Sequence, residues 1–170
     1  MASQETATEK RGAAIVVQKD EAPSWWQPVP ANGHCEVRVS PRNVPGLPWS
    51  TGTQTVAPGG HIREHQHPEH DEVLHYFEGE GIAVIDGEEY PIQPGTTIYV
   101  GPNRRHKFIN TGSGPMSFFW FMLPGGLENF FEAIGRDRVP GQPAPEPFAR
   151  PTDVLEIEKR TVFSNVGNLE

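Results

Sequence analysis

Short runs of β-branched and aromatic residues alternate with glycine and proline between Gly46 and Leu123. Such runs, separated by turn-forming residues, are typical of antiparallel strands. The pair Asp86-Gly87 predicts a tight hairpin, because glycine tolerates the positive φ that such turns require. Strands are expected near 34–39, 50–57, 61–67, 72–78, 81–85, 88–92, 96–100, 105–110 and 116–123. This spacing predicts an all-β sandwich or barrel.

A helical periodicity follows the last expected strand. Four apolar residues within 127–134 recur at helical spacing, and Gly135 is a suitable helix end, so we expect one helix lying against the barrel. Residues 139–151 contain five prolines and predict an extended surface segment. The pattern after Pro151 fits either a second short helix or a strand.

The organisation expected from these patterns is a single domain with two flanks. Residues 1–12 are polar and are expected to form a disordered tail, residues 13–124 the β-barrel, and residues 125–170 a helix and proline-rich segment packing on the barrel. Within the barrel portion, residues 13–17 are a candidate N-terminal strand, and Trp25 and Trp26 beside it could serve a subunit interface.

The balance of charged residues limits the classes of binding partner that can be expected. The chain has 14 Lys+Arg against 22 Asp+Glu, a formal net charge of −8, and no basic cluster longer than Arg104-Arg105. This argues against a nucleic-acid or anionic membrane surface and leaves a small-molecule substrate as the expected partner. The longest apolar run, 118–123, is far shorter than the roughly 20 residues that cross a bilayer. Because Cys35 is the single cysteine and no apolar signal segment is visible, a cytoplasmic location is expected.

Five of the seven histidines fall within residues 61–75. His65 and His67 are two apart, so in a strand their imidazoles point the same way. The polar segment after them turns the chain, so Glu72 can return on the neighbouring strand, and His106 can reach the same point from a distant one. These four side chains are the expected metal ligands, while the remaining histidines are expected to have solvent or packing roles.

These residues carry a family resemblance. Gly59, His65, His67, Glu72 and Gly79 reproduce the first motif of the cupin superfamily, G(X)5HXH(X)3-4E(X)6G, at every fixed position.

The second cupin motif is matched by Gly95, Pro102, His106 and Asn110, with PxxxH where the consensus reads PxGxxH. Its glycine is replaced, with Arg104 near its place. The resemblance implies a jelly-roll-like β-barrel with a metal inside its mouth, and a homodimer that pairs outer sheet faces.

The neighbours of the ligands along each strand are the candidate substrate contacts. Counting by twos places Leu74 and Tyr76 on the face of Glu72, and Phe108 on the face of His106. Arg63 shares the face of His65 and could meet an anionic substrate. Tyr76 is also a candidate for proton transfer.

Three imidazoles and one carboxylate leave open positions on a divalent transition metal, so a catalytic site is favoured over a structural one. The ligand types suit iron, which we expect, and also Mn, Ni, Co, Cu or Zn. The segment 123–135 resembles the cap of small quercetinase-like cupins. That resemblance implies a dioxygenase acting on an aromatic or enolisable oxygenated compound, with Glu72 as both ligand and general base.

Two other function classes remain open at this point. One is a non-redox isomerase, decarboxylase or lyase in which the metal acts as a Lewis acid and Glu72 or Tyr76 moves the proton. The other is a small-molecule-binding cupin without turnover.

Overall fold

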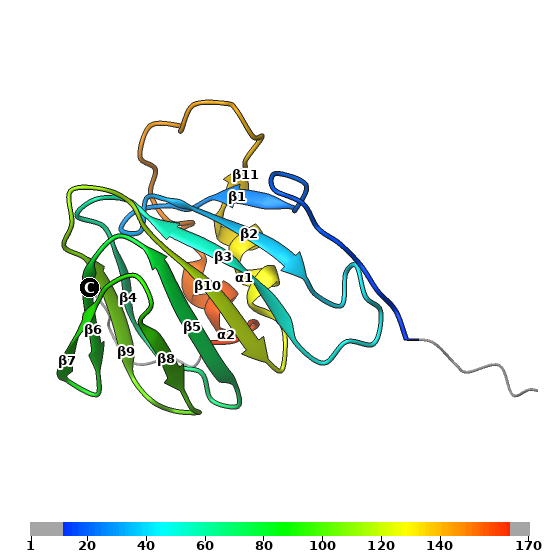
Figure 1. Ribbon diagram of the computed structural model, residues 1–170, viewed down its shortest axis with the longest axis horizontal. Coiled ribbons are helices and arrows are strands. Elements are labelled where there is room, and N and C mark those ends of the chain that lie inside the picture. Colours follow the sequence, from blue (N-terminus) through cyan, green and yellow to red (C-terminus); the bar gives the residue numbers. More distant parts are fainter. Residues whose placement is uncertain (1–11, 164–170) are drawn as a thin grey trace, which may run out of the picture.

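The computed structural model describes residues 12–163, which form two β-sheets and two short helices (Figure 1). The strands are β1 Ser24–Trp26, β2 His34–Val39, β3 Ser50–Val56, β4 His61–His65, β5 Asp71–Glu78, β6 Gly81–Ile85, β7 Glu88–Ile92, β8 Thr97–Val100, β9 His106–Asn110, β10 Met116–Leu123 and β11 Arg136–Asp137. The larger sheet has the order β11-β1-β2-β3-β10-β5-β8, and the smaller one has the order β4-β9-β6-β7. The all-β prediction is confirmed, and each expected strand is present with its ends shifted by at most two residues.

The hairpin between β6 and β7 has the predicted geometry. Ile85 pairs with Glu88, so Asp86 and Gly87 form a two-residue loop. Their φ angles are 49° and 89°, and two successive positive φ values are what such a loop requires. The local turn chemistry therefore sets the register of this strand pair.

The N-terminal region differs from the prediction. Residues 13–17 form no strand, and Ile15 and Val16 are exposed. The strand is instead β1, where Trp25 pairs with Cys35 of β2 and Asp137 of β11. Strands of three and two residues are too short to show an alternating pattern. Trp25 is buried within the chain, so it does not belong to an exposed face.

The helix predicted after the last long strand is α1, Leu127–Ile134, and it ends at Gly135 as expected. Its apolar face is buried, and the ring of Phe131 lies 5.7 Å from that of Trp120 on β10. The ambiguous pattern after Pro151 forms a helix, α2, Val154–Lys159. Figure 1 shows both helices behind β3 and β10. No helix within residues 12–163 is long and apolar enough to cross a membrane.

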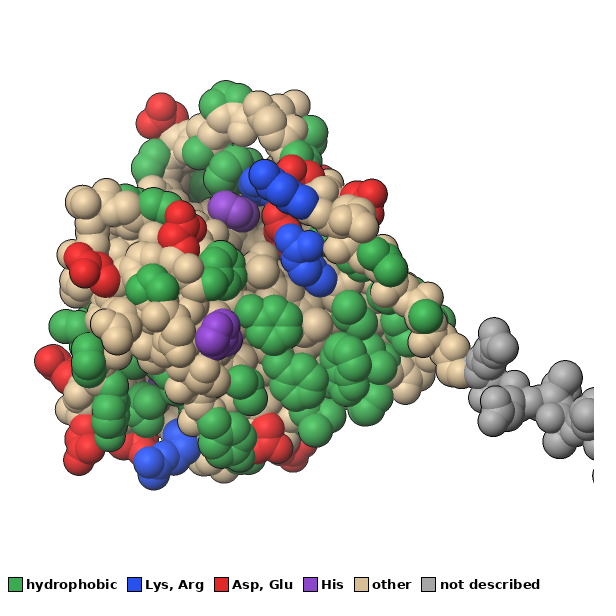
Figure 2. All heavy atoms as spheres, in the orientation of Figure 1, with side chains coloured by type: hydrophobic (Ala, Val, Ile, Leu, Met, Phe, Trp, Pro, Cys, Tyr) green, Lys and Arg blue, Asp and Glu red, His purple; other side chains and the backbone are tan. Residues whose placement is uncertain are grey.

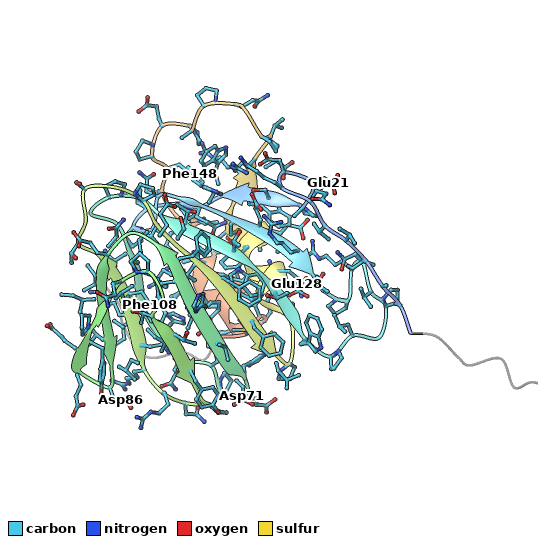
Figure 3. All side chains as sticks on the ribbon, viewed as in Figure 1. Glu21, Asp71, Asp86, Phe108, Glu128 and Phe148 are labelled. Carbon is cyan, nitrogen blue, oxygen red and sulfur yellow. The ribbon has the colours of Figure 1, made fainter. Side chains whose placement is uncertain are left out.

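The core lies between the two sheets and under α1. On β5, Leu74 and Tyr76 are buried, whereas His75 points to the outer face and is exposed. Phe108 of β9, labelled in Figure 3, is also fully buried and packs 5.5 Å from the His106 ring. The inner faces of β5 and β9 therefore carry both the core and the candidate ligands.

Candidate metal centre and its cavity

The four candidate ligands converge on one point from both sheets. His65 ends β4 and lies opposite His106, which begins β9, and Glu72 comes from β5 of the larger sheet. One ligand atom from each of His65, His67, Glu72 and His106 lies within 4.8 Å of the others. The distant His106 thus meets the residues of the first motif, as the sequence suggested.

His67 reaches this point differently from the expectation. The strand ends at His65, so His67 lies in the connection between β4 and β5 instead of continuing the strand. The backbone N–H of Asn103 donates to the His67 carbonyl at 2.8 Å, and the Asn103 side chain donates to the Pro68 carbonyl at 3.2 Å. These bonds tie the His67 loop to the loop that precedes His106.

Asn103 also explains how the second motif tolerates the loss of its glycine. The consensus glycine stands three residues before the histidine, which is position 103 here, and not 104. Asn103 has φ 60°, a left-handed conformation that asparagine adopts more readily than most residues. The loop therefore keeps the conformation that a glycine would supply and still presents His106.

Backbone carbonyls determine which nitrogen of each imidazole is free. Nδ1 of His65 contacts the Arg63 carbonyl at 2.8 Å, and Nδ1 of His106 contacts the Arg104 carbonyl at 2.8 Å. Nδ1 of His67 contacts the carbonyl of Val162 at 2.9 Å. A carbonyl only accepts hydrogen bonds, so each Nδ1 must carry the proton. Each Nε2 is then an unprotonated lone-pair donor in the neutral imidazole, as a metal ligand requires.

The atoms facing the centre have no other partner. Nε2 of His67, Nε2 of His106 and Oε2 of Glu72 are buried and make no hydrogen bond. Glu72 Oε2 lies 3.1 Å from His106 Nε2 and 3.7 Å from His67 Nε2. Unpaired buried polar atoms are costly, and a cation between them would satisfy all three. The donor set fits a divalent transition metal.

The charge states of the site suit a metal. Burial by itself raises the pKa of the Glu72 carboxyl. When His106 and His67 carry a proton on Nε2, their hydrogen bonds and positive charge outweigh burial and hold that pKa well below its usual range. Burial, followed by the neighbouring His106 and His67, lowers the pKa of His65 well below 6.5. At neutral pH the site therefore presents an ionised carboxylate and a neutral His65, which are the forms that bind metal.

A cavity opens beside the centre on the side of His65 and Glu72. Leu74, Phe108 and Arg63 line this cavity, and their part in substrate binding stays a prediction. The rest of the wall is mostly apolar and aromatic and includes Phe118, Trp120, Leu127, Phe130, Phe131, Ile134 and Phe163. The two remaining ligands, His67 and His106, do not line the cavity, so the centre is open on one side.

Tyr76 occupies a different place from the other candidates. It is fully buried, its ring packs 4.8 Å from that of Phe118, and it does not line the cavity. Its hydroxyl has no hydrogen-bond partner. Burial, with a smaller contribution from the Glu72 charge, raises its pKa well above 10, so the hydroxyl is neutral. Its part in proton transfer stays a prediction.

The remaining histidines have different surroundings. His75 is exposed, and its Nδ1 lies 2.8 Å from Thr97 Oγ1. His34 packs edge-on against Trp26, and burial together with the charge of Arg138 lowers its pKa to about 4. His61 lines the cavity, in contrast to the solvent or packing role expected for it.

Sequence reasoning missed the contribution of the C-terminal segment. Phe163 lies 5.2 Å from the His65 ring and 5.0 Å from the His67 ring, and Val162 supplies the carbonyl that orients His67. Arg150 and Glu158 also line the cavity. No motif marks these residues, because they act through contacts with residues far away in the sequence.

Comparison with known proteins agrees with this geometry. Residues 52–122 match the family described as the Cupin domain. The tetracenomycin polyketide synthase protein TcmJ of Streptomyces glaucescens is 28% identical over 84% of this chain and 89% of TcmJ. The quercetin 2,3-dioxygenase of Bacillus subtilis is 30% identical over 45% of this chain, which is 23% of that enzyme. A solved structure from Thermotoga maritima, a predicted oxalate decarboxylase, aligns with a TM-score of 0.56 and 21% identity over 65% of this chain and 99% of that one, which shows a shared fold.

Proposed function

The chain is a member of the cupin superfamily, and from this premise we propose that it is a metal-dependent dioxygenase acting on a small aromatic or enolisable oxygenated compound. The cofactor is one divalent transition metal, iron in this proposal, held by His65, His67, Glu72 and His106. The single observation that supports this most directly is that these four ligand atoms converge and open on one side into an apolar cavity.

The cavity supports the substrate class. Phe118, Trp120, Phe130 and Phe131 line it, so a flat apolar body is favoured there. The sequence relatives point to the same kind of molecule, because one is named for quercetin and the other for the polyketide tetracenomycin. A small aromatic compound with an acidic oxygen fits both the walls and the ligand set.

The residues of this chain would bind and orient the substrate and move its proton. A divalent metal, when bound, lowers the pKa of a substrate hydroxyl that coordinates it. The Glu72 carboxylate lines the cavity beside the other ligands and is placed to accept that proton. Leu74 and Phe108 pack against the substrate body and exclude water.

The alternative is a non-redox isomerase, decarboxylase or lyase that uses the same site. The observation that favours it is TcmJ, the relative covering most of both chains, which is a polyketide synthase protein and not an oxygenase by name. In this case Glu72 would still accept the proton, and no O2 would be consumed.

Elemental analysis followed by oxygen-electrode assays would separate these proposals. We expect about one equivalent of transition metal per chain and substrate-dependent O2 uptake on a panel of flavonols, hydroxyketones and β-diketones. Conversion of a substrate without O2 uptake would replace the dioxygenase by the alternative, and absence of any metal would refute both.

The role of Glu72 has its own test. Glu72→Gln should retain part of the metal, through the three histidines, and lose turnover, whereas His75→Gln on the exposed face of the same strand should match the wild type. Unchanged turnover in Glu72→Gln would remove this residue from proton transfer.

A further inference from the structure

Arg63, Arg150 and Glu158 meet at the wall of the cavity, and we call the two arginines the arginine pair. Arg63 lies on β4, Arg150 lies near the end of the proline-rich segment 139–151, and Glu158 lies on α2. Glu158 Oε1 accepts a hydrogen bond from Arg63 at 2.5 Å and another from Arg150. All three side chains are largely buried and line the same cavity as the metal ligands His65 and Glu72.

The charges of this group do not balance. Two guanidinium groups share a single carboxylate, which leaves one positive charge. Among the residues lining the cavity, the only other carboxylate is Glu72, which belongs to the metal centre. An uncompensated charge beside apolar walls is unfavourable, and a bound anion would relieve it. The chain as a whole carries a net charge of −8, so this local positive excess runs against its overall composition.

The donors of the arginine pair are also in excess. Each guanidinium has five N–H donors in a planar fork that matches a carboxylate. Glu158 Oε1 is the one acceptor to which Arg63 and Arg150 are hydrogen-bonded in the described part of the chain. Donors therefore remain for a second carboxylate.

The position of the arginine pair fits a substrate of limited size. Arg63 stands two residues before His65 on β4, where the pairing with β9 shifts by one residue, and both residues line the cavity. Two residues of strand span at most roughly 7 Å between their Cα atoms. A ring bearing an acidic oxygen at one side and a carboxylate at the other spans a separation of this order. The apolar walls between the two ends favour an aromatic body over a sugar.

We propose that Arg63 and Arg150 form a carboxylate-binding subsite beside Glu158, and that the substrate is an aromatic acid whose carboxylate binds there. This inference rests on the proposed function, because it takes the cavity beside the metal centre as the substrate site. It adds the substrate's charge and the residues that select it.

Calorimetric titration of the metal-loaded protein with salicylate and with salicylamide tests this inference, because the two probes differ in the carboxylate. We expect salicylate to bind roughly tenfold more tightly, the range of one charge-assisted contact. Arg150→Gln should remove most of that preference, and Arg150→Lys should restore part of it. Arg42→Gln is the matched control, since Arg42 pairs with Glu132 at 2.6 Å and does not line the cavity.

Glu158→Gln provides a test with the opposite sign. Removing the competing carboxylate should strengthen salicylate binding several-fold, a gain that damage to the fold cannot mimic. Equal binding of the two probes by the wild type, an unchanged preference in Arg150→Gln, or tighter binding of inorganic phosphate than of salicylate would overturn the inference. Binding is measured without turnover, so the two proposals can fail separately. O2 uptake without a preference for salicylate over salicylamide would refute the subsite alone. A preference for salicylate without turnover of any substrate would refute the proposed reaction alone.

Discussion

Binding of a metal at the candidate site should raise the thermal stability of this protein by an amount that follows from the burial of the candidate ligands. Nε2 of His67, Nε2 of His106 and Oε2 of Glu72 are buried without a hydrogen-bond partner. One such group costs roughly 1–3 kcal/mol, so satisfying all three is worth roughly 3–9 kcal/mol before dehydration of the ion is subtracted. A metal present at a thousandfold excess over its Kd stabilises the folded state by about 4 kcal/mol, within that range.

Differential scanning calorimetry measures this effect directly. In a domain of this size 1 kcal/mol shifts Tm by roughly 2–4 °C, so chelation should lower Tm by about 8–16 °C and added metal should restore it. His106→Ala should fold, contain little metal and show no metal-dependent change in Tm. His75→Ala, whose imidazole is exposed on the outer face, should behave as the wild type. A shift below about 2 °C on complete stripping, or a full equivalent of metal in His106→Ala, would refute the assignment of the site.

Three further predictions concern residues outside the metal centre. Since burial and Arg138 lower the pKa of His34 to about 4, the unfolded chain binds a proton that the folded chain excludes between pH 6.5 and 4, and stability falls as pH falls through this window. Between pH 7 and 4.5 the free energy of unfolding in urea should fall by roughly 1–2 kcal/mol less in His34→Gln than in the wild type, a figure already reduced for the partial exposure of His34. The same pH dependence in both proteins would contradict this prediction. Burial raises the pKa of the Cys35 thiol, so an aromatic disulfide reagent should label it roughly 100-fold more slowly in the native than in the unfolded protein; equal rates would show that the site is open. The homodimer expected from the family would use the hydrophobic side chains gathered over the larger sheet in Figure 2, so Phe119→Glu should convert dimer to monomer in sedimentation analysis, and an unchanged mass would exclude this face.

Much of the fold follows from local patterns. The alternation of buried and exposed residues along β5 places Glu72 and Leu74 on one face and His75 on the other, because side chains in a strand alternate. The Asp86-Gly87 turn sets its hairpin through two positive φ values. The alternation of side chains along a strand and the conformation of a tight turn both depend on a few neighbouring residues. The sequence alone therefore determined the two faces of β5 and the hairpin at Asp86-Gly87.

The four residues of the candidate metal site could also be identified from the sequence, since their spacing matches a motif whose residues converge. The way in which the backbone brings these residues together could not be identified from the sequence. His67 lies beyond the end of β4, and its place depends on bonds from Asn103, while its tautomer depends on the Val162 carbonyl. A pattern of residue types does not record which backbone carbonyl will face a ring nitrogen.

The substrate side of the site was decided by tertiary structure. Arg63 was recognisable from its strand face, but its partner Glu158 lies 95 residues away, and Arg150 comes from a segment that reads only as proline-rich. Tyr76 shares the face of Glu72 and yet is turned into the core by its packing against Phe118. Strand position decides which face a side chain occupies, whereas only the packing of distant segments decides whether that face is core, cavity or cap.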